Sequence, residues 1–301
     1  MATPGLAQAH EESVRLYAAD GYPLGGTLYT AAGNEPRRVA LLHSGAGIPA
    51  ASYAGFAGFL AAQGISALTY DYRGIGQSRP SALRGFKATL EDWAEFDCAA
   101  AVSWLRGRFP GAEMIGIAHS VGAFLLGGAH NAGEQARLVL VGGHTGYYGD
   151  YRARYRLLMA ITWHGVMPMI ARVLGYFPAR RLGLGDDIPA EIAVQWAARR
   201  SPELRPAGKD PRSMRVRRLL DRCASLERPA LIVSITDDAF ATPAGLNRLM
   251  TYYPRLSPLQ HLQFAPADAG IPRIGHFGFF RRRAGAVLWP RLLARLEAEA
   301  A

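Results

Sequence analysis

The chain has 301 residues, half of them hydrophobic, so it can bury the core of one large domain or of a domain with an insertion. Its formal net charge is +10, but the arginines are scattered and no nucleic-acid-binding module is visible, so we expect no nucleic acid partner. The two arginine clusters, at residues 215–218 and 281–283, are interpreted as solvated faces, with steering of an acidic substrate or partner as the alternative.

Strand-like and helix-like runs alternate through the first half of the chain. The predicted elements are hairpin strands over 13–17 and 25–30, a strand over 39–42, a helix over 52–63, a strand over 65–70, a helix over 90–108, a strand over 114–118, a helix over 121–128 and a strand over 138–141. This alternation is typical of a mainly parallel sheet that is covered by helices on both faces.

The pattern changes at about residue 144. From there to residue 226 the sequence is rich in aromatic, methionine and proline residues and shows no clear strand, which predicts a helical insertion. Alternation resumes with strands over 230–235 and 259–264 and a closing helix over 284–298. We therefore predict an α/β core in two parts, residues 1–143 and 227–301, and a helical cap or lid over residues 144–226.

Ser120 lies between an apolar, strand-like run and a run of small and apolar residues that is typical of a helix. Ala118 stands two positions before it and Gly122 two positions after it, which is the layout of the nucleophile elbow G-x-S-x-G with alanine in place of the first glycine. Such a turn is so tight that only small residues fit beside it, and it places the serine hydroxyl at a helix N-terminus, where developing negative charge is favoured. We interpret Ser120 as a nucleophile; the alternative is a serine in an ordinary strand-to-helix turn.

A serine nucleophile needs a base, and the base needs a third group to orient it. Asp238 follows the strand at 230–235, and His276 lies in the loop before the closing helix, flanked by glycines and aromatic residues. Serine, acid and histidine then follow in the chain order expected of this arrangement. We predict His276 as the base and Asp238 as its partner; the alternatives are a solvated turn acid and an ordinary loop histidine.

Two backbone N–H groups are needed to stabilise the oxyanion of an acyl transfer. The first candidate is Val121, directly after the nucleophile, and the second is Gly45 or Ala46 in the loop after the first buried strand. His119 is adjacent to the serine, and neighbouring side chains on such a turn point apart, so we interpret it as a packed or capping histidine. His43 is interpreted as a structural residue that braces the oxyanion loop.

Together these segments resemble the α/β-hydrolase superfamily and, within it, the bacterial serine-aminopeptidase-like or lysophospholipase-like group. The resemblance rests on six segments in order along the chain: residues 20–23, 43–47, 71–78, 118–122, 237–238 and 275–280. It implies the α/β-hydrolase fold with a cap in the insertion, although Ser44 stands where many relatives have glycine. It also selects Asp238 over Asp237, because the family's acid lies just before a short apolar stretch. The serine at the elbow argues against dehalogenase and epoxide hydrolase chemistry, for which the resemblance would require an aspartate at that position.

We therefore predict a carboxylesterase-like or lipase-like serine hydrolase that cleaves a small-molecule ester through an acyl-enzyme on Ser120. The aromatic and methionine residues of the insertion favour an apolar acyl or alcohol group. Candidate substrate contacts are Trp163, Trp196, Ala46 and His119. The alternatives are an acyltransferase that uses the same triad and a non-catalytic binding or scaffold protein on this fold.

The remaining expectations concern compartment and cofactors. No secretory signal is visible, and no run reaches the roughly 18 apolar residues of a membrane span, so we expect a cytoplasmic protein without stable membrane insertion. Cys98 and Cys223 are too few for a disulfide framework and lack metal-ligand spacing. We expect neither a metal nor a cofactor.

Overall fold

The computed structural model describes residues 10–33, 36–198, 206 and 208–298 of the chain. Residues 1–9, on which the expectation of no secretory signal partly depends, lie outside this part. The strands in the described residues are β1 (His10–Tyr17), β2 (Pro23–Thr30), β3 (Arg38–His43), β4 (Ile65–Tyr70), β5 (Glu113–His119), β6 (Arg137–Val141), β7 (Tyr176–Phe177), β8 (Ile188–Pro189), β9 (Ala230–Ile235) and β10 (Leu259–Phe264).

Eight of these strands form one sheet in the order β1-β2-β4-β3-β5-β6-β9-β10. The opening hairpin β1–β2 is antiparallel and β2 pairs antiparallel with β4, whereas all the other pairs are parallel. Strand β4 is buried along its whole length, as expected of a strand with both faces covered, while β1 is an exposed edge strand. The predicted α/β-hydrolase sheet is therefore confirmed.

Helices connect and cover these strands. The α-helices are α1 (Ala54–Ala62), α2 (Leu90–Asp92), α3 (Ala99–Arg108), α4 (Gly122–Leu125), α5 (Ala153–Ile161), α6 (Met167–Leu174), α7 (Ala190–Ala197), α8 (Pro211–Ser225), α9 (Pro243–Met250), α10 (Gly275–Gly278) and α11 (Arg282–Ala298). The 3-10 segments are η1 (Ala50–Tyr53), η2 (Gly76–Ser78), η4 (Leu126–Gly128), η5 (Ala132–Glu134), η6 (Tyr148–Asp150), η8 (Ala179–Leu182) and η9 (Pro266–Ala269), and the π-helical segments are η3 (Trp93–Cys98) and η7 (Thr162–Val166).

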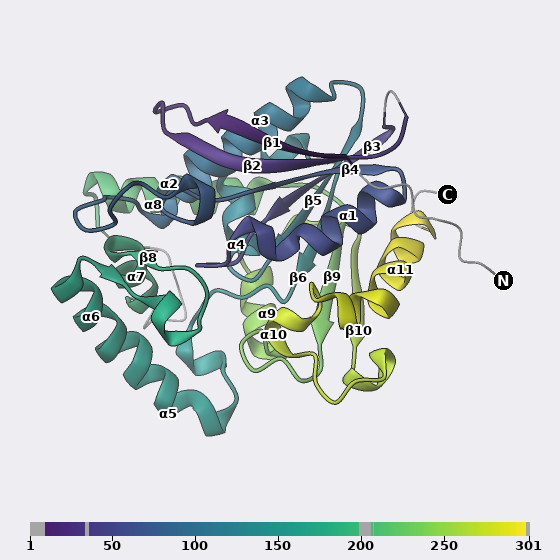
Figure 1. Cartoon of the computed structure of the whole chain (residues 1–301). Coiled ribbons are helices and arrows are strands. Elements are labelled where there is room, and N and C mark those ends of the chain that lie inside the picture. The colour runs from purple at the N-terminus through teal and green to yellow at the C-terminus, as the bar shows by residue number, and fades with distance from the viewer. Residues whose placement is uncertain (1–9, 34–35, 199–205, 207, 299–301) are drawn as a thin grey trace.

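Helices lie on both faces of the sheet (Figure 1). The buried apolar side chains form two separate clusters, one on each face. On one face α1 and α11 pack Phe56 and Trp289 against each other, with ring centroids 5.3 Å apart. On the other face α3 contributes Val102, and α8 contributes Leu219 and Cys223. This arrangement confirms the predicted three-layer architecture.

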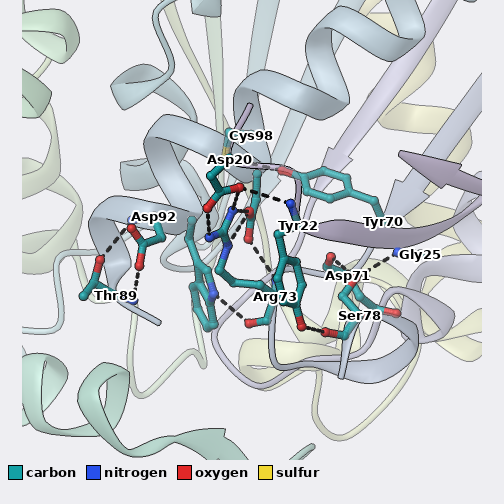
Figure 2. A network of polar contacts seen from close by, with 12 residues as sticks. Asp20, Tyr22, Gly25, Tyr70, Asp71, Arg73, Ser78, Thr89, Asp92 and Cys98 are labelled. Atoms are coloured by element: carbon teal, nitrogen blue, oxygen red, sulfur yellow. Dashed lines mark hydrogen bonds and ion pairs between the residues drawn. The ribbon is translucent and has the colours of Figure 1, made fainter. Parts of the chain in front are cut away.

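The segment after β4 forms a network of polar contacts, and the buried guanidinium of Arg73 lies at its centre (Figure 2). Arg73 donates to Asp20 of the opening hairpin at 2.6 Å and to Asp97 of η3 at 2.8 Å. In the same region Thr89 and Asp92 exchange side-chain and backbone hydrogen bonds, forming a capping box at the start of α2. The contacts of Arg73 thus connect the opening hairpin and η3 to the segment that follows β4.

Asp71, at the start of this segment, holds the neighbouring loops in place. Its carboxylate accepts hydrogen bonds from the backbone N–H groups of Ala50 at 2.7 Å and Gln77 at 2.9 Å. Burial raises the pKa of Asp71 to about 6, although both hydrogen bonds act in the opposite direction. The backbone carbonyl of Asp71 also accepts from the Ser78 hydroxyl, which in turn accepts from the N–H of Gly25 (Figure 2).

The predicted insertion at 144–226 divides in the structure. Residues 144–198, which we call the cap segment, hold α5, η7, α6, α7 and the short hairpin β7–β8, whereas α8 packs in the layer on the sheet, next to η4. The expectation that the insertion contains no strand was wrong, because strands of two residues are too short to produce an alternating pattern.

The cap segment is anchored to the core beside the loop after β3. Arg79 forms ion pairs with Asp186 at 3.1 Å and with Asp187 at 3.0 Å. Asp186 also accepts a hydrogen bond from the N–H of Gly76, and its own N–H donates to the carbonyl of Gly47 at 2.6 Å. The cap segment and the loop before η1 therefore share backbone contacts.

Candidate active site

Ser120 sits at the sharp turn between β5 and α4. Its φ is +56°, and it is the one residue other than glycine with a positive φ in the described part of the chain. A Cβ atom at Gly122 would come within 2.7 Å of the carbonyl oxygens of His43 and Ser44, so the loop after β3 requires glycine there. The strained turn and the close approach have the geometry of a nucleophile elbow.

The structure brings the three residues predicted as a triad together. The Ser120 hydroxyl lies 2.9 Å from Nε2 of His276, and Nδ1 of His276 lies 2.7 Å from a carboxylate oxygen of Asp238. All three side chains are buried. This chain of hydrogen bonds can remove the hydroxyl proton and stabilise the imidazolium that results.

Asp238 is held as a carboxylate by its surroundings. Its second oxygen accepts hydrogen bonds from the backbone N–H groups of Phe240 at 2.8 Å and Ala241 at 3.0 Å. Burial acts to raise the pKa of Asp238, but the charge of His276 and the hydrogen bonds from His276 and these N–H groups outweigh it and lower the pKa to about 2. The acid therefore stays ionised at any pH near neutral.

Asp237 holds the segment that carries His276. Its two carboxylate oxygens accept hydrogen bonds from the N–H groups of Ile274 at 3.0 Å and Gly275 at 2.9 Å, at the start of α10. Asp237 thus caps this short helix, and it is the neighbouring Asp238 that contacts the histidine.

A second histidine, His144, contacts the nucleophile and was not identified from the sequence. Its Nε2 atom lies 3.2 Å from the Ser120 hydroxyl, and its Nδ1 atom accepts a hydrogen bond from the N–H of Gly146. Because Nδ1 accepts, the proton of a neutral His144 is on Nε2, which donates to Ser120. The available signal was its position just after β6, since the carboxyl ends of parallel strands meet at one edge of the sheet.

The proposed oxyanion donors differ in whether their N–H groups are already engaged. The N–H of Gly45 donates to the hydroxyl of Tyr53 at 2.9 Å, so it is not available to an oxyanion. Within the described residues, the N–H groups of Val121 and Ala46 have no protein acceptor, and Ala46 lines the cavity described below. Of the two alternatives for the second donor, the geometry therefore favours Ala46 over Gly45, and it leaves the N–H of Val121 available as the first.

His119 belongs to a hydrogen-bonded chain that joins two loops of the site. Its Nε2 lies 3.1 Å from the carbonyl of His276, which can only accept, so Nε2 carries the proton and Nδ1 accepts from Tyr53 at 2.8 Å. Burial, together with the charge of His276, lowers the pKa of His119 to about 3, so the ring stays neutral. The chain Gly45–Tyr53–His119–His276 therefore connects the loop after β3 to the loop of the predicted base.

His43 lies below the site, within the core. Its ring nitrogens lie 2.8 Å from the Tyr70 hydroxyl and 2.9 Å from the Gln135 side-chain oxygen, and burial lowers its pKa to about 4. No group of three or more histidine, cysteine, aspartate or glutamate side chains in the described residues is arranged to hold a metal ion.

The Ser120 side chain lines a cavity of about 340 Å³ that lies between the core and the cap segment. Four predicted substrate contacts line it, namely Ala46, His119, Trp163 and Trp196. The other apolar side chains of the wall are Ile48, Pro49, Tyr53, Tyr151, Met167, Phe177, Ala179, Leu184, Ile188, Ile192, Ala193, Phe240, Phe277 and Phe280. A cavity of this size and composition suits an apolar ligand with one reactive polar group.

Comparisons with known proteins place this geometry in context. The sequence model of the family described as serine aminopeptidase, S33, matches residues 34–255. No curated protein matches the chain. The solved structure of an esterase from Pyrococcus furiosus is 15% identical, with a TM-score of 0.59 over 97% of this chain and 90% of that chain. The α/β hydrolase GrgF from Penicillium sp. sh18 is 15% identical, with a TM-score of 0.61 over 94% of this chain and 96% of that chain. A thermophilic esterase from Thermogutta terrifontis is 15% identical, with a TM-score of 0.57 over 94% of this chain and 98% of that chain.

Proposed function

The chain belongs to the serine aminopeptidase S33 family of the α/β-hydrolase superfamily, and from this membership we propose that it hydrolyses carboxylic esters through an acyl-enzyme on Ser120. The observation that carries the proposal is the chain of hydrogen bonds from Ser120 through His276 to Asp238, at 2.9 Å and 2.7 Å, beside a largely apolar cavity. The cap segment supplies much of the wall of that cavity, so we propose that it acts as the substrate-binding lid.

The reaction proceeds in two steps. In the first, the Ser120 oxygen attacks the ester carbonyl carbon while His276 takes its proton, and the N–H groups of Val121 and Ala46 stabilise the oxyanion. His276 then donates the proton to the departing alcohol as the carbon–oxygen bond breaks. In the second step His276 removes a proton from water, the resulting hydroxide attacks the acyl carbon, and Ser120 regains a proton as the acid leaves.

The Ser120 oxygen faces a hydrogen-bond donor, His144, in addition to the base, His276. The Nε2–H of His144 points to this oxygen, which carries negative charge when it attacks and again when the acyl group departs. We propose that His144 stabilises that charge while His276 moves the proton.

The cavity favours an ester over the N-terminus of a peptide. A peptide substrate of an aminopeptidase presents an ammonium group, which needs a carboxylate or a similar acceptor in the site. Among the described residues that line the cavity there is no aspartate or glutamate, and the charged residue on its wall is Arg281. We therefore propose an uncharged or anionic ester with an apolar acyl or alcohol group as the substrate.

A labelling and turnover experiment tests this proposal. The purified chain should react with a fluorophosphonate probe and hydrolyse p-nitrophenyl esters, and Ser120→Ala should abolish labelling and lower kcat by about 10⁴-fold or more. Ser52→Ala, another serine on the cavity wall, is the matched control and should keep both activities. If the acyl group passes mainly to an added alcohol and little to water, the enzyme is an acyltransferase. If wild-type protein is neither labelled nor active, the chain is a binding protein on this fold.

A further inference from the structure

The cap segment carries an exposed apolar face. Its segments α5, η7 and α6 form one continuous helical stretch, Ala153–Leu174. Only 17% of the 18 most apolar consecutive residues of this stretch are buried. The side chain of Leu157 is 74% exposed and that of Val173 is 69% exposed. The other large exposed apolar side chains of the stretch are Leu158, Ile161, Val166 and Met169. A soluble surface rarely gathers so many apolar side chains unless something covers them.

This helical stretch lies between the cavity and the outside. Trp163 and Met167, on its inner side, line the cavity, and Figure 1 shows α5 and α6 as one rod along the outer edge of the molecule. Two further apolar side chains line the cavity and are also exposed: Leu184, which is 53% exposed, and Phe277, which is 43% exposed. Exposed apolar side chains therefore occur on the outer face and beside the cavity that holds Ser120.

The charged residues within the segment that carries this face have one sign. The aspartates at its two ends, Asp150, Asp186 and Asp187, are buried and form ion pairs with Arg248 and Arg79. The sequence from Tyr151 to Gly185 contains six arginines and neither aspartate nor glutamate. Arg154 stands near the start of the helical stretch, Arg172 near its end, and Arg181 just beyond it, all exposed. None of these three arginines forms an ion pair with another described residue. The face thus offers an apolar strip with cationic ends, which is the pattern of a helix that lies in a membrane interface.

We infer that this face of the cap segment docks on an anionic lipid surface, with the helical stretch lying flat in the interface and its arginines among the headgroups. The stretch has 22 residues, and the mean hydropathy of its most apolar 18 residues is 1.5, so its length and composition would also allow it to cross a bilayer. However, Met167, Pro168 and Ala171 are buried, and α6 packs against α7, which keeps the helix on the cap segment. A lipid interface covers one side of a helix and leaves that packing intact.

A second copy of the chain fits this face less well. In a symmetric pair, each face would meet the same face of the partner, so arginines would oppose arginines without any acid to neutralise them. An anionic bilayer supplies both missing components, the apolar phase and the negative charge. Together with the proposed function, docking would place a cavity for apolar esters against the phase in which such esters dissolve.

Vesicle binding tests this inference without using catalysis. Full-length Ser120→Ala protein is sedimented with vesicles of phosphatidylcholine alone and with vesicles of an equal mixture of phosphatidylcholine and phosphatidylglycerol. We expect binding to the mixed vesicles that weakens with salt. A variant with Leu157→Ser, Ile161→Ser and Val173→Ser should bind more than about tenfold more weakly, because each exposed side chain loses its apolar burial. A variant with Arg154→Gln, Arg172→Gln and Arg181→Gln should lose about fivefold in affinity for each arginine removed.

The control replaces exposed apolar side chains outside the cap segment, Leu259→Ser in β10, which is 48% exposed, and Val287→Ser in α11, which is 41% exposed. It should bind vesicles like the parent. The inference is overturned if the parent does not bind the mixed vesicles, or if the control loses as much binding as the cap variant. It is also overturned if light scattering shows a dimer that the cap variant dissociates while vesicles are not bound. Because the serine is absent throughout, vesicle binding can succeed even if wild-type protein proves inactive toward esters, and the reverse also holds.

Discussion

The Nε2 atom of His144 lies 3.2 Å from the hydroxyl oxygen of Ser120, whose other imidazole neighbour is His276 at 2.9 Å. The two rings have different partners: His276 is backed by the carboxylate of Asp238, and His144 by the N–H of Gly146. A carboxylate favours a charged imidazolium, whereas an N–H donor opposes one. The geometry therefore separates a proton carrier from a fixed hydrogen-bond donor.

The first prediction concerns this donor. His144→Phe keeps a ring for packing against Trp196 but removes the hydrogen bond to Ser120, and we expect kcat to fall by about 10- to 100-fold, the range for a lost hydrogen bond to a charged group. His144→Gln can still donate and should recover part of the rate. Acylation and deacylation rates are measured separately by rapid mixing with a p-nitrophenyl ester. Equal rates for wild-type and His144→Phe protein would show that His144 is a packing residue only.

The second prediction separates the adjacent acids. Asp238→Asn should disturb the tautomer and orientation of His276 and lower kcat by roughly 10²- to 10⁴-fold, with little change in KM. Asp237→Asn retains one acceptor for the N–H groups of Ile274 and Gly275, so it should cost less than about tenfold in rate and about 1 kcal/mol in stability. Kinetics and thermal unfolding of both variants check this ranking. The opposite order would assign the catalytic role to Asp237.

The third prediction concerns the wall of the cavity. Trp163→Ala should enlarge it and shift kcat/KM toward longer acyl chains, by about 10- to 200-fold at most for each added methylene. Trp196→Ala should also lower kcat, because its ring lies 5.8 Å from that of His144 and supports it. A series of p-nitrophenyl esters gives the chain-length profile, and fluorophosphonate labelling controls for an intact nucleophile. If both variants keep the wild-type profile, the lid contacts substrate through other residues.

The fourth prediction concerns acid stability. Burial lowers the pKa of His43 to about 4, and burial with the charge of His276 lowers that of His119 to about 3, whereas both titrate near 6.5 in an unfolded chain. Below about pH 6.5 the unfolded state therefore binds protons that the folded state does not, and the stability contributed by the neutral rings is lost as the pH falls.

Between about pH 7.5 and pH 5 each histidine should remove about 2 kcal/mol from the free energy of unfolding. Protonation of Asp71, whose pKa burial raises to about 6, acts in the opposite direction over the same range. Urea unfolding at the two pH values measures the total. His119→Gln should lose about 2 kcal/mol less than wild-type protein over this range, because the contribution of His119 is removed while those of His43 and Asp71 stay. A pH dependence unchanged by that substitution would mean that His119 does not stay neutral in the folded protein.

The sequence identified the part of the site that depends on chain order and on local sterics. Ser120 was found from the small residues around it, and Asp238 and His276 from their places after predicted strands and before the closing helix. The structure brings these three together, while their roles remain proposals. His144 was missed because a single histidine after Gly142 and Gly143 has no motif of its own, and only the position of β6 at the same sheet edge reveals it.

The choice between Gly45 and Ala46 depended on a contact with Tyr53, eight positions beyond Gly45, which no local pattern records. The fold itself followed from alternation, because long buried strands and their connecting helices give strong periodic signals. The hairpin β7–β8 gave none, since each strand has two residues. The sequence also could not predict which side of the apolar stretch 153–174 is exposed. Its composition is equally typical of a buried helix, and only the packing in the structure shows which side chains are uncovered.

The hydrogen bond from the N–H of Asp186 to the carbonyl of Gly47 connects the cap segment to the residue that follows Ala46, a proposed oxyanion donor. A cap segment that moves away from the core at this point must either break this hydrogen bond or move the loop that carries Ala46. A ligand that is too large for the cavity would displace the cap segment. It would then also displace the N–H of Ala46 from the position in which it can stabilise the oxyanion. Discrimination by size should then appear as slower turnover of bound substrate, in addition to weaker binding.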